Sequence, residues 1–379
     1  MSTRAATTGV FFANGTAWGL WAAQIPFVQE RFELSKSTLG LVLLTGSIGV
    51  ILSMLLMGQA IVRLGSARST RLGSVALCLA VPLPLLAPEA ALLPVALFAF
   101  GAASAAMDVS MNAHGTAIER ELGRPIMSSL HAGWSFGGFA GAGAAGLATA
   151  ADVDPRAQVT IAAAVLLAGV LASLPALGPG SATAADTRFR LPSRPVVLLT
   201  VMCFLIMVTE GAMADWGGVY LRGDLGTGAG LAASAFAAFA AGMTIGRLTG
   251  DALNRRLGAT RLLRAGSALA ALALGTLLLA AQPAVALAGL VLVGVANSVP
   301  LLFSAAGGGD VETSGPSIAA VSSMGSIGFL VGPPLIGFLA DATSLPAALS
   351  TLCAATGAVA LLAGRAARVS SPARELVAR

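Results

Sequence analysis

Twelve apolar runs, separated by short breaks of Gly, Pro and charged residues, dominate this chain of 379 residues. A helix needs about 20 apolar residues to cross roughly 30 Å of hydrocarbon, and these runs are of that order. Because the bilayer interior offers no water to unpaired backbone groups, each run is expected to be a helix. The sequence therefore predicts an all-α membrane protein with twelve transmembrane helices. The expected spans are residues 8–29, 38–62, 70–88, 92–118, 125–149, 157–176, 195–221, 229–252, 261–281, 284–305, 316–340 and 346–366.

A polar linker separates the runs into two sets of six. Residues 177–194 are rich in Pro, Ser, Ala and charge, unlike the runs on either side. The sets also repeat a pattern, since Gly58 and Arg63 near the end of the second run recur with the same spacing as Gly250 and Arg255 near the end of the eighth. Parallel repeats of this kind are typical of carriers whose halves are related by an axis along the membrane normal. We expect two pseudo-symmetric six-helix bundles, at residues 1–176 and 195–379, joined by a cytoplasmic linker at 177–194, with a short cytoplasmic tail after the second bundle.

Composition supports a membrane protein and argues against several other classes. Hydrophobic residues make up 56% of the chain and charged residues only 10%, against roughly 25% charged residues in soluble domains. The net charge of +5 is scattered over short loops, so no nucleic-acid surface is expected. All three cysteines fall within apolar runs, which makes a disulfide framework unlikely to be part of the design. The first run continues without a small-residue cleavage pattern, so no removable signal peptide is expected.

The distribution of Lys and Arg predicts the orientation of the chain. With the N-terminus in the cytoplasm, 18 of the 22 basic residues, Arg247 among them, fall on the inner side. Short cytoplasmic loops of membrane proteins carry such an excess of Lys and Arg. We therefore expect a multi-pass protein of the inner membrane with both termini in the cytoplasm. The four basic residues left on the outer side are Arg31, Lys36, Arg156 and Arg222.

Three segments carry a resemblance to a known family. They are DVSMNAH at residues 108–114, SSLHAGWSFGG at 128–138 and EGAMADW at 210–216. With twelve runs in two halves and a Gly/Arg loop after the second and eighth, the chain resembles the major facilitator superfamily over essentially its whole length. The three segments resemble its YbjJ-like bacterial branch, which is often compared with fucose-permease-type sugar symporters. The resemblance implies a secondary transporter that works by alternating access.

The Gly/Arg loops depart from the superfamily pattern in one respect. The family usually has Asp directly before the Arg, whereas this chain has Val62 and, in the second copy, Asn254. The acid of an inner gate would then have to come from another residue, with Asp251, Glu119 and Glu121 as candidates. The expected gating residues are Arg63, Asp251 and Arg255 at the inner side and Asp215 at the outer side.

Ionisable side chains at membrane depth are the candidates for proton coupling. Asp108 and Glu210 lie well inside their runs, where a charge costs about 2.5–3.5 kcal/mol on insertion scales. Such side chains normally face a cavity or a partner, so we expect both to carry protons; static pairing with a neighbouring helix is the alternative. His131 is expected either to relay protons or to hydrogen-bond a neighbouring helix permanently, and His114 to be structural.

A stripe on the first run suggests a solute-binding face. Asn14, Trp18 and Trp21 recur at spacings of four and three, so they share one face of a helix. Aromatic faces next to an amide suit stacking on a sugar or another ring, although an interfacial belt also uses Trp. The other expected solute contacts are Asn112, one turn from Asp108, Asn297, which could instead join helices, and Trp216, which could instead be a belt residue.

These observations predict a secondary active transporter that takes up a small polar solute, a sugar or sugar-like, together with protons. The alternatives are efflux of an amphipathic drug or metabolite by proton antiport and a membrane solute sensor that does not transport. An enzyme is not expected, because the G-x-S-x-G match at residues 133–137 lies inside a helix rather than at a strand-to-helix turn. No cofactor and no metal site is expected. The expected partners are the solute, protons and the lipid bilayer, and the expected state is a monomer.

Overall fold

The computed structural model describes residues 2–123, 126–179, 194–298 and 311–369, without the side chains of 194–196, 251, 311–320, 322–323 and 366–369. Every described element is helical. The first half contains α1 (Thr3–Arg31), α2 (Lys36–Leu64), α3 (Ser66–Ala80), α4 (Leu83–Leu86), η1 (Ala90–Leu92), α5 (Leu93–Leu122), α6 (Met127–Ala150), α7 (Pro155–Ser173) and η2 (Leu174–Leu177). The second contains α8 (Arg194–Val219), the π-helical η3 (Tyr220–Asp224), α9 (Ala229–Ala233), α10 (Ala235–Leu257), α11 (Ala259–Ala280), α12 (Pro283–Asn297), α14 (Val311–Ala342) and α15 (Leu345–Val369).

These elements overlap all twelve expected spans. Within the described ranges, nine helices are long and apolar enough to cross a membrane. The other three passes are α1, α6 and α12. The first two carry many polar or small residues, and α12 covers 15 residues, with the expected continuation at 299–305 outside the described residues. The expectation of an all-α membrane protein is confirmed.

Local sequence signals explain where several helices begin. Ser35 caps α2 by accepting a hydrogen bond from the Thr38 amide, and Asp154 caps α7 in the same way, as short polar side chains do at helix starts. Both Gly/Arg loops turn at a glycine with positive φ: Gly65 has φ 80° and ψ 155°, and Gly258 has φ 77° and ψ 154°. Residues with a side chain rarely adopt this conformation. The same corner therefore recurs at equivalent places in the two halves.

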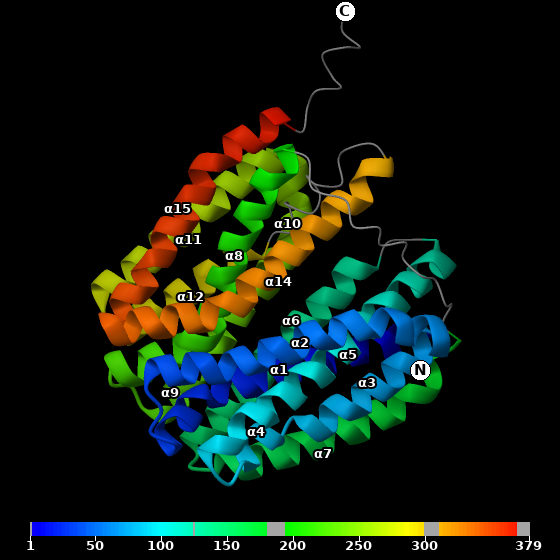
Figure 1. Cartoon of the computed structure of the whole chain (residues 1–379), viewed down its shortest axis with the longest axis horizontal. Coiled ribbons are helices and arrows are strands. Elements are labelled where there is room, and N and C mark those ends of the chain that lie inside the picture. Colours follow the sequence, from blue (N-terminus) through cyan, green and yellow to red (C-terminus); the bar gives the residue numbers. More distant parts are fainter. Residues whose placement is uncertain (1, 124–125, 180–193, 299–310, 370–379) are drawn as a thin grey trace, which may run out of the picture.

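The helices form two groups in space (Figure 1). Helices α1 to α7 lie together in the lower part of the view, and α8, α10, α11, α12, α14 and α15 lie together above them, while the short α9 packs on α6 and α1 of the first group. Within the first group, α1 packs on α6 and α2 on α5, and within the second group, α8 packs on α14 and α10 on α12. Between the groups, α2 packs on α14 and α6 on α10. These two contacts flank the space in which the candidate site lies.

Glycines allow unusually close packing of α1 on α6. A Cβ on Gly19 would lie 2.2 Å from the carbonyl oxygen of Gly138, and one on Gly141 would lie 2.4 Å from that of Thr16. No real Cβ approaches a backbone atom so closely, so the two helices touch through their backbones. Small residues at helix interfaces permit this approach in membranes, where van der Waals contact rather than the hydrophobic effect drives association.

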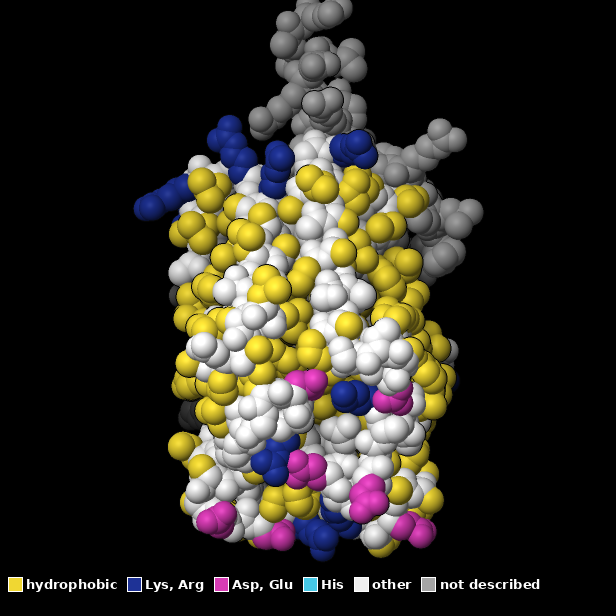
Figure 2. Space-filling model, turned by 90° about the vertical axis from the view of Figure 1, so that its left-hand side faces the viewer, with side chains coloured by type: hydrophobic (Ala, Val, Ile, Leu, Met, Phe, Trp, Pro, Cys, Tyr) yellow, Lys and Arg dark blue, Asp and Glu magenta, His cyan; other side chains and the backbone are white. Residues whose placement is uncertain are grey.

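The surface has an apolar zone and two different polar ends. Figure 2 shows Lys and Arg side chains at the top of the view, a largely hydrophobic zone below them, and acidic and basic side chains together in the lower half. The end of the molecule at which α2 and α10 finish, called the basic end, carries Arg63, Arg68, Arg255, Arg256 and Arg261. The opposite end, called the mixed-charge end, carries Glu30, Arg31, Glu33, Lys36, Glu89, Asp152, Asp154, Arg156, Arg222, Asp224 and Asp341.

Candidate functional site

A cavity of about 430 Å³ lies between the two groups of helices. Its walls come from α1, α2, α5 and α6 on one side and from α8, α10 and α14 on the other. This volume is within the roughly 300–1,000 Å³ range of small-molecule sites. The charged lining consists of three carboxylates, Asp108, Glu210 and Asp215. The cavity therefore combines acids from both halves in one space.

Hydrogen bonds fix the wall formed by the first half. Trp18 Nε1 donates to Ser104 Oγ at 2.7 Å, and Asn14 Nδ2 donates to the Ser104 carbonyl oxygen at 3.3 Å. Trp134 Nε1 in turn donates to Asn14 Oδ1 at 2.8 Å. We call these four residues the indole network. All four line the cavity, and the buried amide of Asn14 joins α1, α5 and α6.

The expected stripe on α1 thus faces the cavity, since Asn14, Trp18 and Trp21 all line it. Trp18 and Trp21 also pack against the ring of Phe100, at centroid distances of 5.4 and 6.3 Å. Ser104 and Trp134 are cavity-lining residues that were not expected from the sequence. A signal for each exists, because Ser104 lies one turn before Asp108 and Trp134 lies in the same family-like segment as His131.

Asp108 lines the cavity from α5, and Asn112 supports it rather than facing the cavity itself. Asn112 Nδ2 donates to Asp108 Oδ1 at 3.1 Å and to the Asp108 carbonyl oxygen at 2.9 Å. The amide group of Asn112 is turned to Asp108, and Asn112 is not part of the cavity wall, so its contact with solute stays a prediction. Its position one turn away explains the hydrogen bond to Asp108, since residues four apart share a helix face.

On α8, both acids line the cavity. Asp215 was expected at the outer gate because five residues place it on a different helix face from Glu210. The structure places Asp215 in the cavity wall beside Ala214, and its role in gating stays a prediction. Trp216, expected to contact solute, lies apart from this wall. Its side chain is fully buried, and its Nε1 has no hydrogen-bond partner among the described residues.

Arg247 was counted with the basic residues of the inner side, and the structure places it between the two groups of helices instead. It is half-buried on α10 and donates to Ser135 Oγ on α6. Its Cζ lies 5.4 Å from the centroid of a Trp134 ring. It also interacts electrostatically with Glu210. A guanidinium thus connects the second half to two cavity-lining residues of the first.

Three further candidates lie outside the cavity wall. His131 Nδ1 donates to the Met127 carbonyl oxygen at 3.0 Å, and its ring meets Phe11 edge-on. Asn297 is buried at the end of α12, and its Nδ2 has no partner in the described parts of the chain; its contact with solute stays a prediction. His114, expected to be structural, binds the Leu177 carbonyl oxygen at 2.9 Å and thereby ties α5 to η2.

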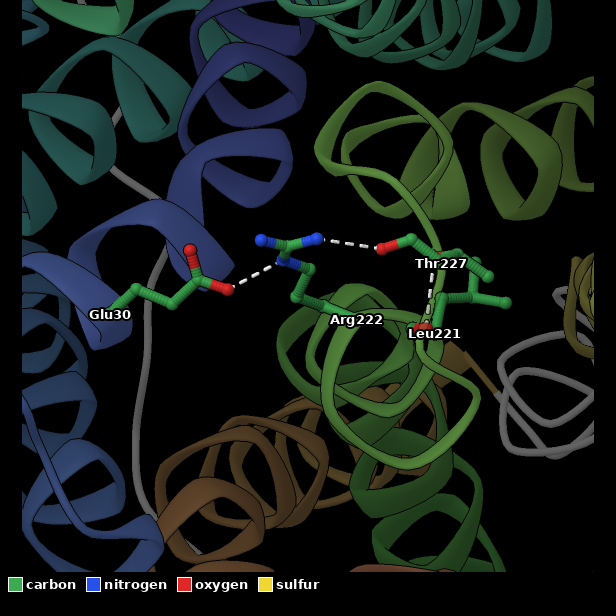
Figure 3. Close-up of polar contacts among 4 residues, drawn as sticks. All are labelled: Glu30, Leu221, Arg222 and Thr227. Atoms are coloured by element: carbon green, nitrogen blue, oxygen red, sulfur yellow. Dashed lines mark hydrogen bonds and ion pairs between the residues drawn. The ribbon is translucent and has the colours of Figure 1, made fainter.

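Polar contacts join the two halves at the mixed-charge end. Glu30 at the end of α1 pairs with Arg222 of η3 at 2.5 Å, and Arg222 also donates to the Thr227 carbonyl oxygen at 2.8 Å (Figure 3). At a second point, Asp341 of α14 accepts from the amides of Lys36 and Ser37 at 3.1 and 2.9 Å. The Ser37 hydroxyl donates to the same carboxylate at 2.5 Å. We call this second point the Asp341 clamp.

Close backbone contacts reinforce the closure at that end. A Cβ on Gly40 would lie 2.8 Å from the Pro333 carbonyl oxygen, and one on Gly337 would lie 2.4 Å from that of Lys36. Towards the basic end, α2 is less closely packed, since none of its residues between Gly49 and Ile61 is buried. The cavity wall extends into this stretch as far as Met54. The two groups of helices are thus joined at the mixed-charge end and diverge away from it (Figure 1).

The expected inner gate is not assembled in the described part of the structure. Arg63 and Arg255 are exposed at the basic end, and neither belongs to an ion pair between described residues. The side chain of Asp251 lies outside the description. Glu119, one of the acids considered for the gate, caps α6 instead by accepting from the amides of Ile126 and Met127 at 2.7 and 3.0 Å.

Comparisons with known proteins agree on one family. The profile of the Major Facilitator Superfamily matches residues 7–307. An uncharacterised MFS-type transporter of Yersinia pestis is 34% identical over 365 residues, which cover 96% of this chain and 93% of that protein.

Two solved structures share the fold at low sequence identity. A variant of the nucleoside transporter NupG superposes with a TM-score of 0.78 at 12% identity, covering 96% of this chain and 100% of the other. A variant of the E. coli fucose:proton symporter FucP superposes with a TM-score of 0.64 at 18% identity, covering 96% and 98%. At such identities the likeness concerns the fold alone.

Proposed function

Because this chain belongs to the major facilitator superfamily and is a membrane transporter, we propose that it carries a small polar solute with a ring, a sugar or sugar-like, together with protons. The observation that carries this proposal is the cavity lined by Asp108, Glu210 and Asp215 from both halves. Nucleosides and fucose, the solutes named for NupG and FucP, both contain a sugar ring. The placement in the YbjJ-like branch stays a prediction.

The lining suits such a solute chemically. The faces of Trp18 and Trp21 offer surfaces on which the C–H face of a sugar ring stacks,. The carboxylates and the amide of Asn14 offer acceptors for hydroxyl groups. The polar groups are few and fixed among aromatic side chains, which is the usual construction of a specific small-molecule site.

Proton coupling follows from the cost of closing this cavity on charged acids. A carboxylate is far less stable in a low-dielectric space than in water, so a closed cavity favours its neutral form. In the proposed cycle, the carrier that has bound solute closes and reopens on the other side only after Glu210 and Asp108 have each taken up a proton, and the empty carrier returns after solute and protons have both left. The halves would rock about the central site, as in other carriers built from repeats.

We further propose that the protein lies in the inner membrane with the basic end in the cytoplasm. The excess of Arg at this end supports this orientation,. The cavity would then be open to the cytoplasm in this structure. A reporter fused to the C-terminus tests the orientation, because a reporter that is active only outside the cytoplasm should stay silent.

Proteoliposomes loaded with a pH-sensitive dye test the function. Adding L-fucose, D-glucose or uridine in turn is expected to acidify the lumen for at least one of them, because symport moves a proton inwards with the solute. Glu210→Gln keeps the size and hydrogen bonding of the side chain but cannot exchange a proton, so proton movement should fall by roughly ten-fold or more. Glu89→Gln, an exposed acid at the mixed-charge end, is the matched control.

Each part of the proposal has its own failing result. Solute entry without acidification, with Glu210→Gln as active as the control, contradicts proton coupling. No entry of any of the three solutes contradicts the proposed solute class. Solute binding without counterflow of labelled solute contradicts transport and favours a sensor.

Efflux by proton antiport is the second candidate, and the aromatic lining favours it. Phe100, Phe236, Phe239 and Phe329 line the cavity along with three tryptophans, and such a surface also accepts an amphipathic compound. In this case an imposed pH gradient, acidic outside, would drive the compound out of vesicles oriented as in the cell. Sugar-dependent acidification in the assay above decides against it.

A further inference from the structure

Arg247 is the strongest polar feature that the proposed function leaves unused. It lies on α10 in the second half, yet its hydrogen-bond partner Ser135 and its aromatic partner Trp134 both lie on α6 in the first half. Ser135 and Trp134 line the cavity. Arg247 therefore bridges the two halves directly behind the cavity wall.

Trp134 connects Arg247, through hydrogen bonds, to the residues expected to bind solute. Its Nε1 donates to Asn14 Oδ1, and Asn14 shares Ser104 with Trp18. The indole network is thus held at one end by a guanidinium of the opposite half. A movement of Arg247 would release Trp134 and, through Asn14, shift the polar groups that face the cavity.

On its own side, Arg247 has a competing partner in Glu210. The two side chains interact electrostatically, but the described residues contain no ion pair between them. A charged carboxylate forms stronger hydrogen bonds with a guanidinium than a neutral hydroxyl does. Ser135 is therefore the favoured partner only while Glu210 is neutral.

We propose that Arg247 is a positioning residue that exchanges between Ser135 and Trp134 in one half and Glu210 in the other, and so links the proton on Glu210 to the orientation of the indole network. This inference rests on the proposed function, because it takes Glu210 as the proton carrier. Neutral Glu210 leaves Arg247 with the first half, which keeps Trp134 and Asn14 in their solute-binding arrangement. Charged Glu210 withdraws the guanidinium and loosens that arrangement.

Other titratable groups near Arg247 have to be separated from Glu210. His131 lies one turn before Ser135 on α6 and interacts electrostatically with Arg247. Asp108 on α5 and Asp215 on α8 line the same cavity. The test therefore includes variants of these groups as well as of Glu210.

Tryptophan fluorescence of the purified protein, recorded from acidic to alkaline pH, tests the exchange without a known solute. A cation beside an indole ring alters its emission, so the wild-type spectrum is expected to change with pH. Arg247→Gln and Trp134→Phe should each abolish this change. Glu210→Gln should fix the emission at its acidic form. Arg256→Gln, an exposed residue on the same helix, should leave the change intact.

Arg247→Lys provides a second, milder variant. It keeps the charge but lacks the planar fork that stacks on a ring and reaches two partners, so a reduced amplitude is expected. Only variants that elute as monodisperse protein with the wild-type helical content are compared. A pH response that survives in folded Arg247→Gln or Arg247→Lys at full amplitude overturns the proposal. So does a response that survives in Glu210→Gln but disappears in His131→Gln, Asp108→Asn or Asp215→Asn.

The outcomes separate this inference from the proposed function. If wild-type vesicles transport no solute while the fluorescence behaves as expected, the proposed function fails and the coupling between Glu210 and Trp134 stands. If transport is proton-coupled but folded Arg247→Gln keeps the wild-type KM and pH profile of uptake, the role of Arg247 is refuted and the proposed function stands.

Discussion

Gly141→Ala is expected to destabilise the protein strongly, by about 2–3 kcal/mol. The added Cβ would lie 2.4 Å from the carbonyl oxygen of Thr16 and 3.1 Å from its carbonyl carbon. These are backbone atoms of α1, so no rotamer change relieves the contact, and α1 and α6 have to separate. Overpacking of well-packed interfaces typically costs about 1–3 kcal/mol, and the loss of contacts along both helices places this case at the upper end.

Gly143→Ala is the matched control on the same helix, two residues later. A Cβ on Gly143 would meet nothing within 4 Å. Both variants gain the same helix propensity, about 1 kcal/mol in favour of alanine, so the difference between them isolates the contact with α1. Thermal unfolding in detergent measures this difference. The packing argument fails if Gly141→Ala unfolds at or above the temperature of Gly143→Ala.

Asp341→Ala is expected to open the cavity towards the mixed-charge end. The carboxylate accepts three hydrogen bonds from Lys36 and Ser37 at the start of α2. These bonds cross from one half to the other, so they exist only while that end is closed. Hydrogen bonds to a charged group contribute about 1.5–3 kcal/mol when partly buried, and an anion at a helix N-terminus adds a favourable dipole interaction. Because Asp341 is exposed, we expect its replacement to destabilise the closed state of this end by about 1.4 kcal/mol, which raises the ratio of open to closed molecules roughly ten-fold.

Alkylation of a single cysteine measures this shift. Ser47 lines the cavity on α2, and Ser47→Cys in a background without Cys78, Cys203 and Cys353 gives one reactive thiol. An impermeant reagent added on the side of the mixed-charge end is expected to react roughly ten-fold faster when Asp341 is replaced. Glu89→Ala removes an exposed acid at the same end that makes no capping hydrogen bond, and it should leave the rate unchanged.

A second variant ranks the two contacts at that end. Glu30 and Arg222 form an ion pair whose side chains are 50% and 36% exposed. Exposed ion pairs contribute about 0.2–1 kcal/mol, so Glu30→Gln should accelerate alkylation by only about 1.4- to five-fold. If Glu30→Gln has the larger effect, this end is held by the ion pair rather than by the Asp341 clamp. If neither variant changes the rate, it is held by the glycine contacts of α2 and α14.

The periodicity of single runs was enough to predict much of this molecule. Apolar length located the helices, and a spacing of four and three residues placed Asn14, Trp18 and Trp21 on one face, which proves to border the cavity. The cost of a buried charge predicted that Asp108 and Glu210 face a cavity, and both line it. Each of these inferences depends only on one helix and its solvent, and such information is local in the sequence.

Features that depend on neighbouring helices could not be predicted from single runs. Trp216 and Asn112 were assigned to the solute on residue type, but the direction of their side chains depends on which helices pack beside α8 and α5. Arg247 was counted with the inner side because Lys and Arg gather in cytoplasmic loops; its partners on α6 become visible only in three dimensions. The Asp341 clamp joins residues more than 300 positions apart, and no local sequence pattern predicts such a pairing.

The backbone contact between α1 and α6 has a consequence for how the carrier can move. Because α1 and α6 touch backbone to backbone, no side chains lie between them that could rearrange as the helices slide, so the two helices are expected to tilt as one rigid unit. Asn14 lies on α1 and Trp134 on α6, and the hydrogen bond between them is therefore kept during the tilt. A rigid-body tilt of the first half leaves this wall of the cavity unchanged, so the helices of the second half have to adjust to the solute.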